Sequence, residues 1–144
     1  MTPTEYLKKY ANLFVIACEG SHFFPSVKIA QAALETGWGG HIVGNNLYGI
    51  KATGSHTPYW NGQYVSAGTF EYKGGSYKQK NSKFRAYSSI TDSIMDHSYL
   101  IESQSRYQPV RNAKTPEEQA RALQDAGYAT DPSYANKLIS IINS

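Results

Sequence analysis

The sequence contains a single cysteine and no long apolar run. Because Cys18 has no second cysteine to pair with, an internal disulfide and a cysteine-based zinc site are both excluded. A membrane-spanning helix needs about 20 consecutive apolar residues, whereas the apolar run at residues 13–18 is short and Glu19 follows it directly. We therefore expect no membrane span and no signal peptide in these residues, which indicates a cytoplasmic protein, one released by another route, or a domain of a secreted parent.

An excess of one charge and metal-ligand spacing are also lacking. The 14 Lys and Arg residues against 11 Asp and Glu residues leave a net charge of +3, too little for a nucleic-acid-binding protein, so no nucleic-acid partner is expected. No two histidines stand at the i, i+4 spacing of a helical metal site, and we predict neither a metal nor a cofactor. His97 lies in an apolar helical stripe and is predicted to be a hydrogen-bonded core histidine.

Tyrosine, by contrast, is abundant. Twelve tyrosines and two tryptophans combine flat apolar faces with polar tips, which suits a surface that holds sugars or peptides and equally suits an ordinary core and its rim. The 40% hydrophobic and 17% charged residues are typical of a globular protein. The length suits one domain that spans residues 1–144.

Helix signals cluster near both ends of the chain. Thr2-Pro3-Thr4-Glu5 predicts a capping box with proline at the first helical position, and residues 115–118 repeat the pattern. Further helices are predicted from Pro25 to a stop at Gly37, along the apolar stripe of residues 90–101, and after Asp131-Pro132.

The middle of the chain has a different composition. Residues 53–87 are rich in Gly, Ser, Thr and Tyr, with turn signals at Asn61-Gly62 and Gly74-Gly75 and strand-like alternation at residues 69–72. This pattern predicts a small β lobe inserted into a helical body. The expected fold class is therefore α+β and mainly helical.

The densest chemical signal is Ala33-Leu34-Glu35-Thr36-Gly37-Trp38-Gly39. Glu35 ends an otherwise apolar helix just before a glycine turn and a tryptophan, where burial and the negative end of the helix dipole raise the pKa of a carboxyl. A carboxyl that stays protonated near neutral pH can act as a general acid. The alternative is a glutamate that simply faces solvent.

Two further segments give Glu35 a chemical context. The run Asn45-Asn46-Leu47-Tyr48-Gly49-Ile50-Lys51 suits the wall of a cleft, where the amide of Asn46 reads hydroxyl and acetamido groups and Tyr48 adds a hydroxyl. Glu71 lies in the predicted β lobe, and two carboxylates on opposing lobes of a cleft are what hydrolysis of a glycosidic bond needs. Trp38 either stacks on a sugar ring or packs against the helix that carries Glu35.

The chain carries four ordered motifs, at residues 33–39, 45–51, 84–87 and 126–135, and together they strongly resemble glycoside hydrolase family 73. This family comprises peptidoglycan N-acetylglucosaminidases, including flagellar hydrolase domains, autolysins and phage lysins. The resemblance implies a lysozyme-like fold, in which a mainly helical body and a small β-hairpin lobe flank a substrate groove.

The resemblance also implies roles for individual residues. Glu35 falls on the catalytic general acid of the family, and Glu71 on a lobe segment that carries the second carboxylate in several members. The closing motif supplies a tyrosine beside the catalytic glutamate, with Tyr128 as first choice and Tyr134 as second. Tyr48 stands where many relatives have Phe.

Two aspartates, Asp92 and Asp96, compete with Glu71 for the place of the second carboxylate. Their spacing on the helix predicted around residues 90–101 favours structural or capping roles instead. The predicted catalytic residues are thus Glu35, Glu71 and Tyr128, and the predicted substrate-binding residues are Trp38, Asn46, Tyr48 and Tyr134.

The implied activity is that of an endo-β-N-acetylglucosaminidase, which cleaves the β-1,4 bond between N-acetylglucosamine and N-acetylmuramic acid in peptidoglycan glycan strands. A muramidase or lytic transglycosylase is the alternative on the same fold, and a non-catalytic glycan-binding module is the alternative of another class. Either Glu71 activates water or the 2-acetamido group of the substrate is the nucleophile. We expect a monomer that acts on the bacterial cell wall, as a phage-type lysin or as a domain of a secreted protein.

Overall fold

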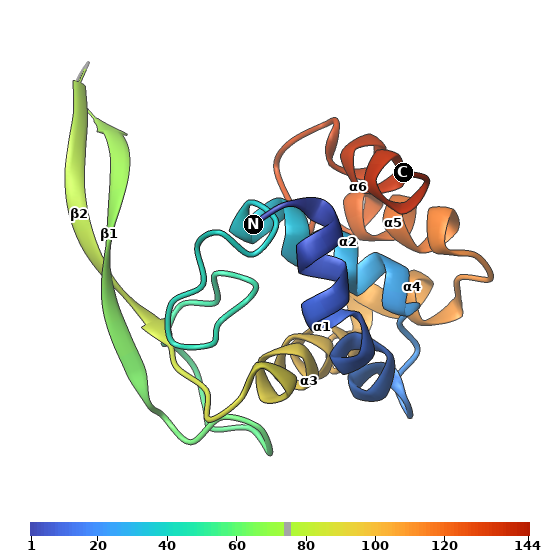
Figure 1. Cartoon of the computed structure of the whole chain (residues 1–144), viewed down its shortest axis with the longest axis horizontal. Coiled ribbons are helices and arrows are strands. Elements are labelled where there is room, and N and C mark those ends of the chain that lie inside the picture. The colour runs from blue at the N-terminus through green and yellow to red at the C-terminus, as the bar shows by residue number, and fades with distance from the viewer. Residues whose placement is uncertain (74–75) are drawn as a thin grey trace.

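A body of helices stands beside a two-stranded antiparallel hairpin in the computed structural model of the chain (Figure 1). The structure describes the backbone of residues 1–73 and 76–144 and the side chains of residues 1–68 and 81–144. The α+β, mainly helical class is confirmed. The elements are α1 (Pro3–Cys18), α2 (Pro25–Thr36), β1 (Tyr64–Lys73), β2 (Ser76–Arg85), α3 (Ile90–Glu102), the 3-10 turn η1 (Ser105–Tyr107), α4 (Gln108–Asn112), α5 (Pro116–Asp125) and α6 (Tyr134–Ile142).

The helix ends follow local hydrogen bonding. At the start of α1 the Thr2 hydroxyl accepts from the Glu5 backbone N–H and the Glu5 carboxylate accepts from the Thr2 N–H, so the predicted capping box is confirmed. Thr115 caps α5 in the same way. The start of α6 is later than the Asp131-Pro132 signal indicated, because the Asp131 carboxylate accepts from the backbone N–H of Ser133 and holds a turn there.

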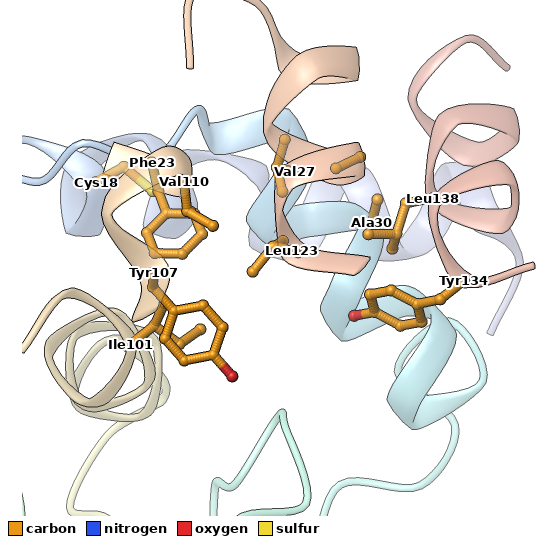
Figure 2. Close-up of a cluster of buried hydrophobic side chains, with 11 residues drawn as sticks. Cys18, Phe23, Val27, Ala30, Ile101, Tyr107, Val110, Leu123, Tyr134 and Leu138 are labelled. Atoms are coloured by element: carbon orange, nitrogen blue, oxygen red, sulfur yellow. The ribbon is translucent and has the colours of Figure 1, made fainter. Parts of the chain in front are cut away.

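Helix α2 lies at the centre of the body because both of its faces are apolar. Val27 and Ala30 pack into one buried cluster, which α3, α4, α5 and α6 complete (Figure 2). Ala32 and Ala33 pack into a second cluster, with aromatic side chains of α1 and with Ile94 of α3. The C-terminal end of α2 emerges from this packing, so Glu35 is exposed at the rim of the body.

The hairpin is longer than the alternation at residues 69–72 predicted. Its register runs from Tyr64 opposite Arg85 to Lys73 opposite Ser76. The Gly74-Gly75 turn signal lies outside the described residues. At the base, the Ala52 N–H donates to the Lys83 carbonyl at 2.9 Å, and the Arg85 N–H donates to the Ile50 carbonyl at 2.9 Å. These bonds join the hairpin to the end of the 45–51 motif and to the residue that follows it.

A buried ion pair fixes the same base to α3. Arg85 donates to the Asp96 carboxylate at 3.0 Å, and both side chains are almost fully buried. Thr57 and Tyr87 donate to the same carboxylate, and the Arg85 guanidinium lies 3.9 Å from the Trp60 ring centroid. Asp96 therefore has the structural role that the sequence favoured.

Candidate active site

A cavity of about 330 Å³ lies between the end of α2 and the base of the hairpin, within the size range of small-molecule sites. The helical body and the loop after α2 supply most of one wall, and the hairpin supplies the other. The lining residues are Glu35, Thr36, His41, Val43, Asn46, Gly49, Ala67, Gly68 and Phe84.

The turn after Glu35 is held in one conformation. The Thr36 hydroxyl donates to the Ala32 carbonyl at 2.6 Å and accepts from the Gly39 N–H at 2.8 Å. Gly37 and Trp38 both have left-handed backbone angles, with φ of 59° and 57°, which reverses the chain at once. The helix consequently stops one residue beyond Glu35 and leaves its carboxyl at the cavity.

Gly49 faces the Glu35 carboxyl from the opposite segment. A Cβ atom at this position would lie 2.9 Å from Oε1 of Glu35, and the residue has a φ of +63°. Both observations favour glycine, because any side chain would be strained and would collide with the carboxyl. The glycine of the 45–51 motif thus makes room for Glu35.

The surroundings of Glu35 favour its protonated form. Although more than a third of the residue is open to solvent, the cavity walls remove part of its hydration, and this desolvation raises the pKa of the carboxyl above its usual range. A carboxyl with a raised pKa in a cavity can donate a proton to a bound oxygen. The acid chemistry predicted for Glu35 therefore has a physical basis in the structure.

Asn46 lines the cavity, but its side-chain amide forms hydrogen bonds with backbone groups. Its Nδ2 donates to the carbonyls of Ile50 and Arg85, each at 2.9 Å. Its Oδ1 accepts from the N–H groups of Tyr48 and Ile50, each at 3.2 Å. Asn46 therefore shapes the loop that carries Gly49 and ties it to the hairpin.

Tyr48 and Trp38 are packed away from the cavity lining. Tyr48 is buried, and its hydroxyl donates to the Lys28 carbonyl at 3.1 Å, so the expectation that this hydroxyl stands on the wall of the groove is not met. The half-buried Trp38 ring lies edge-on to Tyr6, with centroids 5.6 Å apart. Of the two roles expected for Trp38, stacking on a sugar or packing, this contact fits packing, in which the ring supports the turn after Glu35.

Tyr128 and Tyr134 lie side by side near Glu35, with ring centroids 5.5 Å apart. Burial raises the pKa of both phenols, and the nearby Glu35 charge adds to the rise. The Tyr134 hydroxyl accepts from Gln31 at 3.0 Å, and the Tyr128 hydroxyl is 2.7 Å from Nε2 of His97. Of the two, Tyr134 is buried in the core and Tyr128 is partly exposed.

For Glu71, the predicted second carboxylate, the structure gives the position of the backbone. Residue 71 pairs in register with residue 78 on the outer part of the hairpin, and the Glu71 side chain lies outside the described residues. Ala67, four residues earlier on β1, lines the cavity. Asp92, one of its competitors, is in the first turn of α3, where the Ser89 hydroxyl caps its backbone N–H.

Several lining residues had no role assigned from the sequence. Phe84 and Ala67 come from the hairpin base, and Phe84 belongs to the 84–87 motif, which was the signal available for it. His41 and Val43 follow the helix-end motif by a few residues and turn back to the cavity. Among the described residues, no group of three or more His, Cys, Asp or Glu side chains is placed to hold a metal ion, and no helix is long and apolar enough to cross a membrane.

Residues 11–144 match the family Glucosaminidase, described as mannosyl-glycoprotein endo-beta-N-acetylglucosaminidase. The peptidoglycan hydrolase FlgJ of Salmonella typhimurium is 44% identical over 121 residues, which cover 79% of this chain and 37% of FlgJ. The exo-glucosaminidase LytG of Bacillus subtilis is 38% identical over 135 residues, which cover 88% of this chain and 46% of LytG. The chain thus spans less than half the length of these relatives.

A solved structure gives the same likeness in three dimensions. The C-terminally truncated glycoside hydrolase domain of Salmonella typhimurium FlgJ matches with a TM-score of 0.83 at 38% identity, and the match covers 99% of this chain and 96% of that domain. The similarity therefore extends over both the helical body and the hairpin.

Proposed function

The chain belongs to the glucosaminidase family, glycoside hydrolase family 73, and has its lysozyme-like fold, and on this premise we propose that it is an endo-β-N-acetylglucosaminidase of peptidoglycan. The bond cleaved is the β-1,4 bond between N-acetylglucosamine and N-acetylmuramic acid. The place of action is the bacterial cell wall.

The observation that carries this proposal is the position of Glu35. Glu35 lies in the last turn of α2 and lines the cavity. Its carboxyl has a raised pKa and faces a glycine that leaves space beside Oε1. Among the side chains that the structure describes, it is the one carboxyl of the cavity lining. We assign it the role of general acid, which protonates the glycosidic oxygen as the bond to the sugar breaks.

The hairpin would supply the second carboxylate. Position 71 follows Ala67 by four residues, about 13 Å along an extended strand, and Ala67 lines the same cavity as Glu35. We assign Glu71 the role of general base, which removes a proton from the attacking water on the far face of the sugar. Tyr128, near Glu35, would stabilise the charge that develops on the substrate.

Digestion of purified peptidoglycan tests the proposal. Wild type and Glu35→Gln would each be incubated with the wall material, and the new ends would be reduced with borohydride and identified by mass spectrometry. We expect reduced glucosamine ends from wild type and none from the variant. Glu19 is exposed and does not line the cavity, so Glu19→Gln serves as the matched control and should behave like wild type.

The other outcomes each replace the proposal with a defined alternative. Reduced muramic acid ends would identify a muramidase, and anhydro-muramic ends a lytic transglycosylase. Release of long fragments supports endo cleavage, whereas release of terminal sugars alone would identify an exo enzyme. No release from several wall types, together with binding to them, would identify a glycan-binding module.

A further inference from the structure

A buried amine, an imidazole and a phenol form a continuous chain of contacts inside the helical body. Nζ of Lys28 on α2 contacts Nδ1 of His97 on α3, and Nε2 of His97 lies 2.7 Å from the hydroxyl of Tyr128, in the segment between α5 and α6. Lys28 is fully buried and His97 is 3% exposed. Nothing in the chemistry assigned so far requires a lysine at this depth, and its burial has a cost that needs an explanation.

The amino group of Lys28 is placed to donate a hydrogen bond to His97. Nζ lies 4.4 Å from the ring centroid of Tyr48 and 4.7 Å from that of Phe23, and aromatic faces attract positive charge. Burial lowers the pKa of Lys28, while Cys18, Glu102 and Asp96 oppose that shift. An ammonium has three donors and no acceptor. We take Nδ1 of His97 as the acceptor in its contact with Lys28, because the amino group carries N–H donors in its charged and in its neutral form.

This contact determines where His97 carries its proton. Burial and the amino group of Lys28 both lower the pKa of His97, so the ring is neutral near pH 7. A neutral imidazole whose Nδ1 accepts has its proton on Nε2. The Nε2–H then donates to the hydroxyl oxygen of Tyr128. The proton of that hydroxyl is left available for another acceptor.

We propose that Lys28 and His97 are positioning residues that aim the hydroxyl proton of Tyr128 at the substrate beside Glu35. Lys28 selects the tautomer of His97, and His97 donates to the oxygen of Tyr128, so that the phenol O–H points away from His97 and toward Glu35, whose charge acts on Tyr128. The stacking of the His97 ring on Tyr48, with centroids 3.8 Å apart and planes within 6°, holds the imidazole in this orientation. The proposal rests on the proposed function for the identity of the substrate.

The tautomer can be measured without any substrate. In ¹⁵N-labelled wild type, two-bond ¹⁵N–¹H correlation spectra distinguish the two neutral forms of His97. We expect the Nε2–H form at pH 7. The Nδ1–H form would overturn the proposal, because Tyr128 would then donate its proton to His97. Since this readout needs no activity, it stands even when wild type fails to cleave peptidoglycan, which would contradict the proposed function alone.

A double-mutant cycle tests the connection to Tyr128. On a soluble peptidoglycan fragment, Lys28→Met should lower kcat about 10- to 100-fold, less than the typical loss of about 10²–10³ when a charge-stabilising donor is removed outright. KM should stay within about twofold, because only stabilisation of the transition state is lost. In the Tyr128→Phe background, Lys28→Met should have no further effect. A full additional loss there would assign Lys28 a purely structural role.

Two controls keep the cycle interpretable. Lys8→Met removes an exposed lysine of α1 and should leave kcat unchanged. Where Lys28→Met does not fold, His97→Gln and His97→Phe replace it. The Gln amide N–H can donate to Tyr128 as Nε2–H does, so His97→Gln should retain most of the activity that His97→Phe loses. Equal losses in the two variants would contradict the proposal.

Discussion

Gly49 and Glu35 are in such close contact that the glycine defines the space around the Glu35 carboxyl. A Cβ at Gly49 would lie 2.9 Å from Oε1 of Glu35, a separation that real Cβ atoms essentially never show. Gly49 is held in place by the Asn46 amide, which bonds to the backbone on both sides of it. The helix end and the loop are therefore built to fit one another around a single side chain.

This contact predicts a selective loss of activity in Gly49→Ala. The added methyl group displaces the Glu35 carboxyl, and because a misplacement of about 1 Å can cost about 100-fold in rate, kcat should fall about 10- to 100-fold. Gly20→Ala is the matched control, since Gly20 also has a left-handed φ of +79° but no atom within 4 Å of the Cβ position. Both variants should lose about 1–2 kcal/mol of stability from the strained backbone. Equal activity in the two would show that the carboxyl tolerates displacement.

The raised pKa of Glu35 predicts the alkaline side of the activity profile. Because the general acid must be protonated, kcat/KM should fall as pH rises through the pKa of Glu35 in the free enzyme, and desolvation places that pKa above the usual value of about 4.3 for a glutamate. Among the lining residues that the structure describes, His41 is the other one with a titratable side chain. The falling limb should persist in His41→Asn, and its disappearance there would assign the limb to the histidine.

The same shift predicts that the Glu35 carboxyl destabilises wild type once it is ionised. The folded state holds a proton on Glu35 that the unfolded chain releases at lower pH, so the free energy of unfolding decreases as pH rises through this interval. Above it, Glu35→Gln should melt at a slightly higher temperature than wild type. Below pH 4, where the carboxyl is protonated in both states, the two melting temperatures should coincide. Thermal melts at pH 3.5 and pH 7.5 test this, with Glu19→Gln expected to match wild type at both.

The sequence predicted the elements of the fold better than the roles of the residues around the cavity. Capping and helix-stop signals are local, so the ends of α1 and α2 and the position of Glu35 followed from adjacent residues. The short helices η1 and α4 carry few such signals and were not predicted. Nor could the composition of the 45–51 motif reveal that Asn46 and Tyr48 bond to backbone groups of other segments, because those partners are brought near only by folding.

The stability of the protein should depend strongly on the buried Arg85–Asp96 ion pair at the hairpin base. Asp96→Asn leaves the Arg85 guanidinium buried without its counter-charge, and breaking such a pair costs about 3–5 kcal/mol. Urea titration should show this loss as a lower midpoint. The exposed Lys137–Asp131 pair provides the comparison, and Asp131→Asn should shift the midpoint little. Similar midpoint shifts in Asp96→Asn and Asp131→Asn would mean that the hydrogen bonds at position 96, and not its charge, stabilise the hairpin base.

The role assigned to Glu71 makes a prediction about stereochemistry as well as rate. If this carboxylate activates water opposite the leaving group, the new reducing end forms with inverted configuration, as the α-anomer, and Glu71→Gln lowers kcat by about 10²–10⁴. NMR spectra taken in the first minutes of the reaction identify the anomer before it equilibrates. Lys78→Gln is the control, because residue 78 is the register partner of residue 71 and its loss changes the charge of the hairpin without removing a carboxylate. A β-anomer together with an active Glu71→Gln would assign the attack to the 2-acetamido group of the substrate, since two inversions at the same carbon restore the original configuration.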